Sequence, residues 1–341
     1  MKKFFSYIIP LGIGIALFYF FVIPKVDFKK LLEIISNSNP IWLILSCVFG
    51  LISHWARGYR SCMLLKPLGY QVRPCPSFLA VMVGYVSNLM LPRAGEVARC
   101  GVLQKMENVP AQITFGTVVT ERIIDLLILM SLIGVVLLVE FNRISHILFT
   151  FLEGIWSAVP KDKVYWVLGM GMFFTLASII ALYVFRKKIR LFFRTKVGAF
   201  LQGIWQGVLS IRHIENKPLF VFYTLLIWLM YYLMAYILFF VSPETATLTP
   251  VQGLAILVMG GIGMAMPVQG GIGAYNLLVG KTLESYNIVK DAAQNEILSN
   301  TIGTFMHLVQ TLVILVFGGL AFFLVWFVKS RDEKQEARYK T

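Results

Sequence analysis

The sequence predicts an all-α polytopic membrane protein with six full transmembrane helices and two re-entrant or broken helical hairpins, arranged as an inverted repeat. Of the 341 residues, 58% are hydrophobic and only 14% are charged, and the mean hydropathy is +0.75. Soluble domains carry about 25% charged residues, so this composition excludes an ordinary soluble protein. Several apolar runs have the length of membrane-spanning helices, and two shorter runs are interrupted by glycine or end at proline.

Six apolar runs are about 20 residues or longer, enough for a helix to cross the roughly 30 Å hydrocarbon layer. The first begins "MKK", like a signal peptide, but lacks a small-residue cleavage site, so we expect it to be retained as a span. The last is long enough to tilt or to extend beyond the membrane. The six runs cover residues 4–23, 40–58, 112–139, 163–185, 219–241 and 298–327.

Two shorter apolar stretches have a different pattern. Residues 77–91 stop at Pro92, and residues 251–266 are rich in glycine and stop at Pro267. Each is followed by a glycine-containing turn and a second amphipathic stretch. Short, interrupted segments at corresponding positions of two halves indicate helical hairpins that line a binding site. Two ordinary short spans are the alternative.

The distribution of Lys and Arg predicts the orientation. Segment 186–218 carries eight of them, tail 328–341 carries five, and segment 242–250 carries none. Because cytoplasmic loops collect positive charge, we expect both termini and 186–218 to be cytoplasmic. The first hairpin then enters from the cytoplasm and the second from outside, as in inverted-topology repeats. We expect one transmembrane domain over 1–327, with halves at about 1–162 and 163–327, in the bacterial cytoplasmic (inner) membrane.

The formal charge of +14 does not indicate nucleic-acid binding, because the basic residues are spread over loops. The densest run, "FRKKIRLFFRTK", is typical of a cytoplasmic segment on anionic lipid, with a solvated loop as the alternative. Cysteines and histidines show no metal-binding spacing, so we expect no metal and no cofactor.

Charged residues inside the apolar regions predict a polar cluster. Glu121 and Asp125 lie four apart on one face of a span that also holds Arg122. An ionised side chain at the bilayer centre costs roughly 2.5–3.5 kcal/mol, so these groups need partners. Arginines follow Pro92, a residue suited to the first position of a helix. We predict one paired, neutral cluster made of Arg93, Glu96, Arg99, Glu121, Arg122 and Asp125.

Such a cluster has two interpretations. Guanidinium groups bind phosphate in a bidentate manner, so the cluster could open to admit an anion. A structural network that only fixes helix packing is the alternative. The second hairpin carries "MPVQGGIGAYN", whose glycines allow unusual backbone conformations or close helix packing. No GxxxxGK[ST] run supports use of ATP. Further candidate substrate-binding residues are Asn88, Gln269, Gly270, Gly271, Tyr275 and Asn276.

Three motifs together resemble the lysylphosphatidylglycerol synthase/flippase-like transmembrane-domain family. They are "SNLMLPRAGEVARC" at 87–100, "TVVTERIIDLLIL" at 117–129 and "PVQGGIGAYN" at 267–276. The resemblance covers residues 8–327 and implies a membrane domain that moves or accommodates lipids. Members often show Pro-Gly-Gly-x-Gly followed by an acidic residue, whereas Gln269 and Tyr275–Asn276 stand at those places here. We expect the family's aminoacyl-transfer domain to be absent.

We therefore expect a transporter or flippase for an anionic amphiphile, such as a phospholipid or a polyprenyl-phosphate-linked lipid. The arginines would hold the phosphate, and the carboxylates would position them or exchange protons. The alternative is a lipid-binding or scaffold membrane protein that does not transport and that partners a lipid or cell-envelope enzyme. An enzyme acting on lipid-linked substrates has less support, because no Ser/His/Asp arrangement is present. A phospholipid or other anionic lipid, and a second copy of the chain, are the expected partners.

Overall fold

The computed structural model describes residues 26–157, 172, 196–266 and 268–339, and regular structure in this part of the chain is entirely helical. The first half contains α2 (Phe28–Asn37), α3 (Pro40–Leu65), η3 (Lys66–Leu68), α4 (Pro74–Met90), α5 (Ala94–Glu107) and α6 (Ala111–Ser157). The second half contains α9 (Lys196–Leu209), η4 (Ser210–His213), α10 (Lys217–Tyr236), η5 (Ile237–Val241), α11 (Pro250–Ala265), η6 (Gln269–Gly271), α12 (Ala274–Glu284) and α13 (Ala292–Tyr339).

Four helical segments among the described residues are long and apolar enough to cross a membrane: Pro40–Leu68, Ala111–Phe141, Lys217–Val241 and Ala292–Val325. They correspond to four of the six predicted spans. The predicted span 4–23 lies outside the described residues, and so does 163–185 apart from residue 172. The chain is thus a multi-pass integral membrane protein, and the first two of these segments extend beyond their predicted C-terminal ends.

Helix starts follow local sequence signals. A proline lies in the first turn of α3, α4, α10 and α11, where its missing N–H costs no hydrogen bond. Asp27 caps α2 by accepting from two backbone N–H groups, and Thr249 forms a capping box with Gln252 at α11. Within α6 the backbone leaves helical geometry at Glu140, so this long helix is kinked there.

Both short apolar helices turn back into a second helix that packs on them. α4 packs on α5 and α11 packs on α12, so each forms a helical hairpin. The first hairpin starts differently from our prediction. Arg93 has a left-handed backbone conformation (φ 60°), and α5 begins only at Ala94, so Pro92 lies in the turn and not in the helix. In the second hairpin, Gly270, Gly271 and Gly273 all have positive φ, which confirms that their backbone needs glycine-like freedom.

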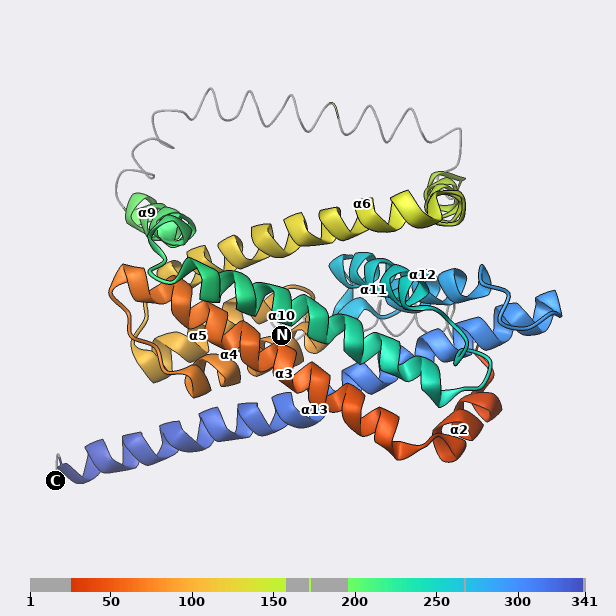
Figure 1. The fold of residues 1–341 in the computed structure, drawn as a ribbon. Coiled ribbons are helices and arrows are strands. Elements are labelled where there is room, and N and C mark those ends of the chain that lie inside the picture. The colour runs from red at the N-terminus through yellow and green to blue at the C-terminus, as the bar shows by residue number, and fades with distance from the viewer. Residues whose placement is uncertain (1–25, 158–171, 173–195, 267, 340–341) are drawn as a thin grey trace.

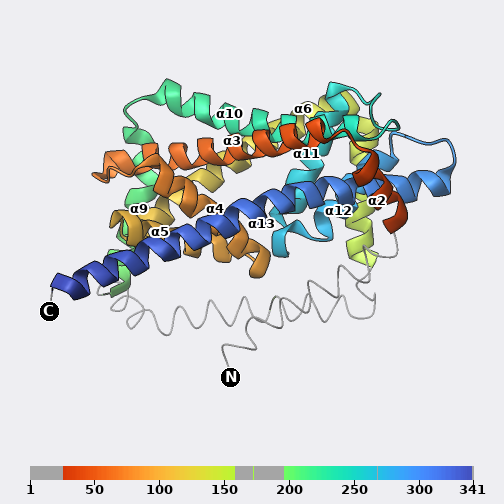
Figure 2. The ribbon, with the colours of Figure 1, turned by 90° about the horizontal axis from the view of Figure 1, so that it is seen from below.

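The two halves contact each other reciprocally. α3 and α10 run side by side, as Figures 1 and 2 show. The hairpin helix α4 packs against α13 of the other half, and the hairpin helix α11 packs against α6. The two hairpins also meet at their turns, because η6 contacts α4 and the Gln269 side chain reaches the Met90 carbonyl oxygen (3.5 Å).

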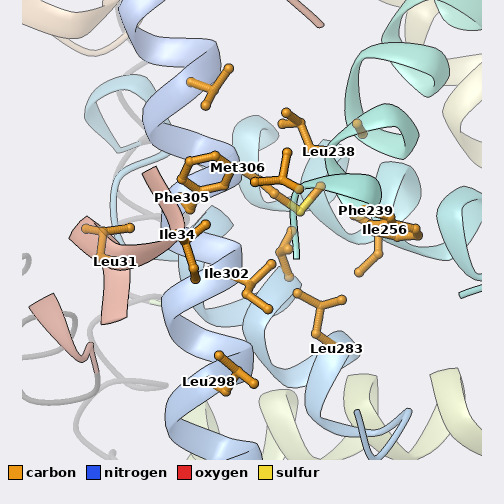
Figure 3. Packing of buried hydrophobic residues seen from close by; sticks show 14 of the residues in the cluster. Leu31, Ile34, Leu238, Phe239, Ile256, Leu283, Leu298, Ile302, Phe305 and Met306 are labelled. Atoms are coloured by element: carbon orange, nitrogen blue, oxygen red, sulfur yellow. The ribbon is translucent and has the colours of Figure 1, made fainter. Parts of the chain in front are cut away.

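Apolar packing holds the second half around α13. Phe305 and Met306 of α13 lie against Leu238 and Phe239 of η5, with α2 covering the opposite side (Figure 3). Elsewhere large apolar side chains face outward, among them Leu127 and Leu138 of α6. In water such exposure would be costly, but hydrocarbon is an equally apolar solvent for these faces.

Candidate functional site

A buried ion pair joins the first hairpin to the long helix behind it. Both terminal nitrogens of Arg99, on α5, donate to the two carboxylate oxygens of Glu121, on α6, each at 2.8 Å. Their side chains are 7% and 1% exposed. A bidentate pair of this kind combines charge attraction with a fixed orientation, so it locks α5 against α6 at one register.

Two arginines that we did not predict complete the cluster. Arg57 and Arg60 of α3 donate to the two oxygens of Asp125, at 2.7 and 2.9 Å, and the Arg60 side chain is fully buried. Arg57 lies at the C-terminal end of the predicted span 40–58 and Arg60 lies beyond it, and neither belongs to the predicted cluster. A signal was present in the sequence, since His54, Arg57 and Ser61 recur at helical spacing and share one face of α3.

The third pair lies nearer to solvent. Arg122 donates to Glu96 at 3.1 Å, with side-chain exposures of 50% and 22%. Arg93 is exposed and has no hydrogen bond or ion pair among the described residues. The prediction that Arg93 belongs to the paired cluster is therefore wrong, because Arg93 lies in the turn before α5, in a left-handed backbone conformation, and pairs with no carboxylate among the described residues.

The cluster carries an excess of positive charge, unlike the neutral set that we predicted. Within the described part of the chain, guanidinium groups of four arginines face three carboxylates. Several buried N–H groups of these arginines have no hydrogen-bond partner there: Nε of Arg57, Nε and Nη1 of Arg60, and Nε of Arg99. Buried donors without partners are costly, so this arrangement has capacity for a further acceptor, preferably a negative one.

A small cavity of about 20 Å³ opens beside the cluster. That volume holds about one water molecule, so a lipid headgroup would need the hairpin to move. Asn88, a predicted binding residue, lines the cavity and accepts a hydrogen bond from the Gly95 N–H (2.7 Å). The lining residues are Arg57, Val81, Gly84, Tyr85, Asn88, Gly95, Glu96, Arg99, Val118 and Arg122.

The predicted residues of the second hairpin do not line this cavity. They form a separate polar cluster in which the Asn276 amide bonds to Thr304 and His307 of α13, and Tyr275 stacks on His307. Gln269 and the Gly270–Gly271 turn lie between the two clusters, where Gly270 approaches Leu89 at the end of α4. The hairpin turns thus connect two polar clusters, one charged and one neutral.

Comparisons with known proteins agree on a membrane family. A family model for the lysylphosphatidylglycerol synthase transmembrane region matches residues 7–293. UPF0104 membrane protein MJ1595 of Methanocaldococcus jannaschii is 22% identical over 270 residues, covering 73% of this chain and 79% of that protein. Glycosyltransferase AglD of Haloferax volcanii is 29% identical over 113 residues, which cover 33% of this chain and only 18% of that protein. No solved structure matches the chain.

Proposed function

Because the chain belongs to the family of the lysylphosphatidylglycerol synthase transmembrane region, we propose that it is a transporter or flippase for an anionic amphiphile. The substrate class is a phospholipid or a polyprenyl-phosphate-linked lipid. The observation that carries this proposal is a pair of buried arginines that line the cavity, Arg57 and Arg99, each with an Nε–H that has no partner among the described residues. A phosphate oxygen is the acceptor that such donors bind best.

The small size of the cavity suggests how the site is closed. Glu96 and Arg122 both line it, and their ion pair is the most exposed of the cluster. In our proposal the Glu96 carboxylate occupies the place of the lipid phosphate, as an internal anion bonded to Arg122. An entering phosphate displaces Glu96 from Arg122 and binds there. The deeper ion pairs, Arg99 with Glu121 and Arg57 with Asp125, keep the helices in register.

The arrangement of the two halves supports alternating access. Each half has a span, a hairpin and a long helix in the same order, and each hairpin packs on the long helix of the other half. Such reciprocal packing is expected when two repeats of inverted topology are related by an axis in the membrane plane. In this proposal the hairpins open in turn toward the two sides, with both chain termini in the cytoplasm.

Substituting the exposed arginine tests the transport proposal. We expect Arg122→Gln to slow the translocation of fluorescent phosphatidylglycerol in proteoliposomes by about tenfold or more, since a charge-assisted hydrogen bond contributes about 1.5–3 kcal/mol. Arg122 is half exposed, so the variant should still fold. Arg93→Gln is the matched control and should transport as the wild type does, because Arg93 does not line the cavity. Equal loss in both variants would contradict the site.

Removing the internal anion should have the opposite effect. We expect Glu96→Gln to bind short-chain phosphatidylglycerol about five- to thirtyfold more tightly, because the competing charge, worth about 1–2 kcal/mol, is gone. Titration calorimetry in detergent measures this change, with short-chain phosphatidylcholine as the zwitterionic comparison. Glu215→Gln, which removes an exposed partner of Lys66, is the control for charge alone. Weaker binding by Glu96→Gln would show that Glu96 assists the lipid and does not compete with it.

A second candidate is a lipid-binding or scaffold protein that partners a cell-envelope enzyme and does not transport. The local likeness to a protein named as a glycosyltransferase favours it, because the shared segment makes up only 18% of that protein. This alternative predicts that purified protein retains phosphatidylglycerol in native mass spectrometry but gives no flux in proteoliposomes. Flux that depends on Arg122 excludes it.

A further inference from the structure

The neutral cluster of the second hairpin is centred on a buried histidine that the proposed transport site does not use. His307 of α13 is 6% exposed. Its Nδ1 lies 3.1 Å from the Asn276 side-chain oxygen on α12, and its Nε2 lies 2.9 Å from the Gly270 carbonyl oxygen in η6. The ring therefore connects α13 to the second arm of the hairpin, α12, and to the turn η6, which also contacts α4.

Both neighbours of the ring are acceptors. The Gly270 carbonyl oxygen can only accept. The Asn276 oxygen is identified by its other contact, because it faces the Gly273 backbone N–H (3.1 Å), which can only donate. The amide nitrogen of Asn276 in turn donates to Thr304 at 3.1 Å. Rotating the amide would bring two donors together at Gly273, so the network fixes its orientation.

A neutral imidazole cannot satisfy this arrangement. It has one N–H and one lone pair, so one of the two contacts would bring a ring lone pair against an oxygen lone pair. An imidazolium has two N–H groups and satisfies both contacts. Two further side chains of this network are uncharged: Tyr275 of α12 stacks on the ring, with 4.7 Å between the ring centroids, and the Tyr275 hydroxyl accepts from Gln310 of α13. The structure gives His307 no carboxylate partner among the described residues.

We propose that His307 is a proton-binding site that couples proton uptake to the position of the second hairpin. The proton comes from hydronium in the surrounding water: an N–H bond forms at the ring nitrogen that lacks hydrogen, and one O–H bond of hydronium breaks to leave water. The protonated ring holds Gly270 and Asn276 on α13. Loss of the proton leaves one of the two nitrogen–oxygen contacts without a hydrogen atom between them, so η6 or the ring moves. The Gln269–Met90 contact then carries this movement to the end of α4. Resting on the proposed function, the coupling ion of transport is then a proton.

Nitrogen NMR tests the proton site without any transport assay. Protein labelled with ¹⁵N-histidine is placed in lipid nanodiscs and titrated from about pH 5 to about pH 8, the range in which histidines change charge. The His307 signals are assigned by their absence in His307→Gln, and exposed His213 is assigned in the same way as a reference. We expect the His307 signals to move from the imidazolium position to the neutral position. Signals that stay at either position throughout overturn the proposal.

Transport at varied pH tests the coupling. We expect wild-type flux of fluorescent phosphatidylglycerol to change by about tenfold per pH unit on one side of the NMR midpoint. His307→Gln should lose this dependence, because glutamine cannot titrate, and His213→Gln should keep it. An unchanged pH profile in His307→Gln overturns the coupling. If no variant transports at any pH, the proposed function fails, while the NMR titration still decides whether His307 binds the proton.

Discussion

Asp125→Asn is expected to destabilise the folded protein by about 3–5 kcal/mol, the usual cost of leaving a buried charge without its partner. Among the described residues, Asp125 is the one carboxylate that pairs with Arg57 and with Arg60. Their side chains are 7% and 0% exposed, and Arg60 already has two nitrogen positions without a partner among the described residues. Asparagine keeps the shape but removes the charge, so two buried cations would lose the carboxylate that they contact directly.

Thermal unfolding in detergent, followed by the loss of monodisperse protein on gel filtration, measures this effect. The control is Glu215→Gln, which breaks the exposed pair with Lys66 and should change stability by less than about 1 kcal/mol. The double variant Asp125→Asn/Arg60→Met should be more stable than Asp125→Asn alone, because it also removes a buried charge. If Asp125→Asn lowers the stability as little as Glu215→Gln does, the buried arginines of α3 do not need the Asp125 charge to keep the protein folded.

The part of the site on neighbouring segments could be predicted from the sequence. Charged residues in an apolar span require partners, and Glu121 identified α6 as the helix to which Arg99 pairs. The α3 arginines were missed because a hydropathy pattern ends a span at its first charged residues. Nothing in that pattern distinguishes an arginine in a loop from an arginine paired with a helix 65 positions later, as Arg60 is with Asp125.

Backbone conformation explains the second difference between prediction and structure, which is the position of Arg93. We predicted that Pro92 starts the second arm of the hairpin and that Arg93 belongs to the paired cluster. In the structure the left-handed conformation of Arg93 makes the turn, so the helix starts after it and Arg93 is exposed, with no ion pair among the described residues. Left-handed residues that are not glycine are uncommon, so local sequence rules did not indicate this one. The glycine turn of the second hairpin followed those rules and was predicted correctly.

Gly95→Ala is expected to separate the arms of the first hairpin and to abolish lipid binding. A Cβ atom at Gly95 would lie 2.2 Å from the Gly84 carbonyl oxygen and 2.7 Å from the Asn88 side chain. The Gly84 oxygen belongs to the backbone of α4, so it cannot move aside alone. Overpacking of this kind costs about 1–3 kcal/mol even where side chains can adjust, and here helix α5 must shift as a whole.

The shift would act directly on the cavity. Gly84 and Gly95 both line it, and Arg99 lies one helical turn after Gly95 on the same face of α5. The reciprocal variant Gly84→Ala places its Cβ 2.9 Å from the Gly95 carbonyl oxygen, so it should show the same defect in a milder form. Thermal stability and retention of phosphatidylglycerol in native mass spectrometry are the two measurements.

Gly101→Ala is the matched control, because it makes the same substitution on the same helix. A Cβ atom there meets nothing within 4 Å. Alanine is a better helix former than glycine, so we expect Gly101→Ala to be neutral or to stabilise the protein by up to about 1 kcal/mol. If alanine lowers the stability at Gly95 but leaves it unchanged or raises it at Gly101, the close approach of α4 and α5 is the cause and helix propensity is not. Similar effects at both positions would mean that the hairpin tolerates separation, and that the arginine cluster alone holds α5 in place.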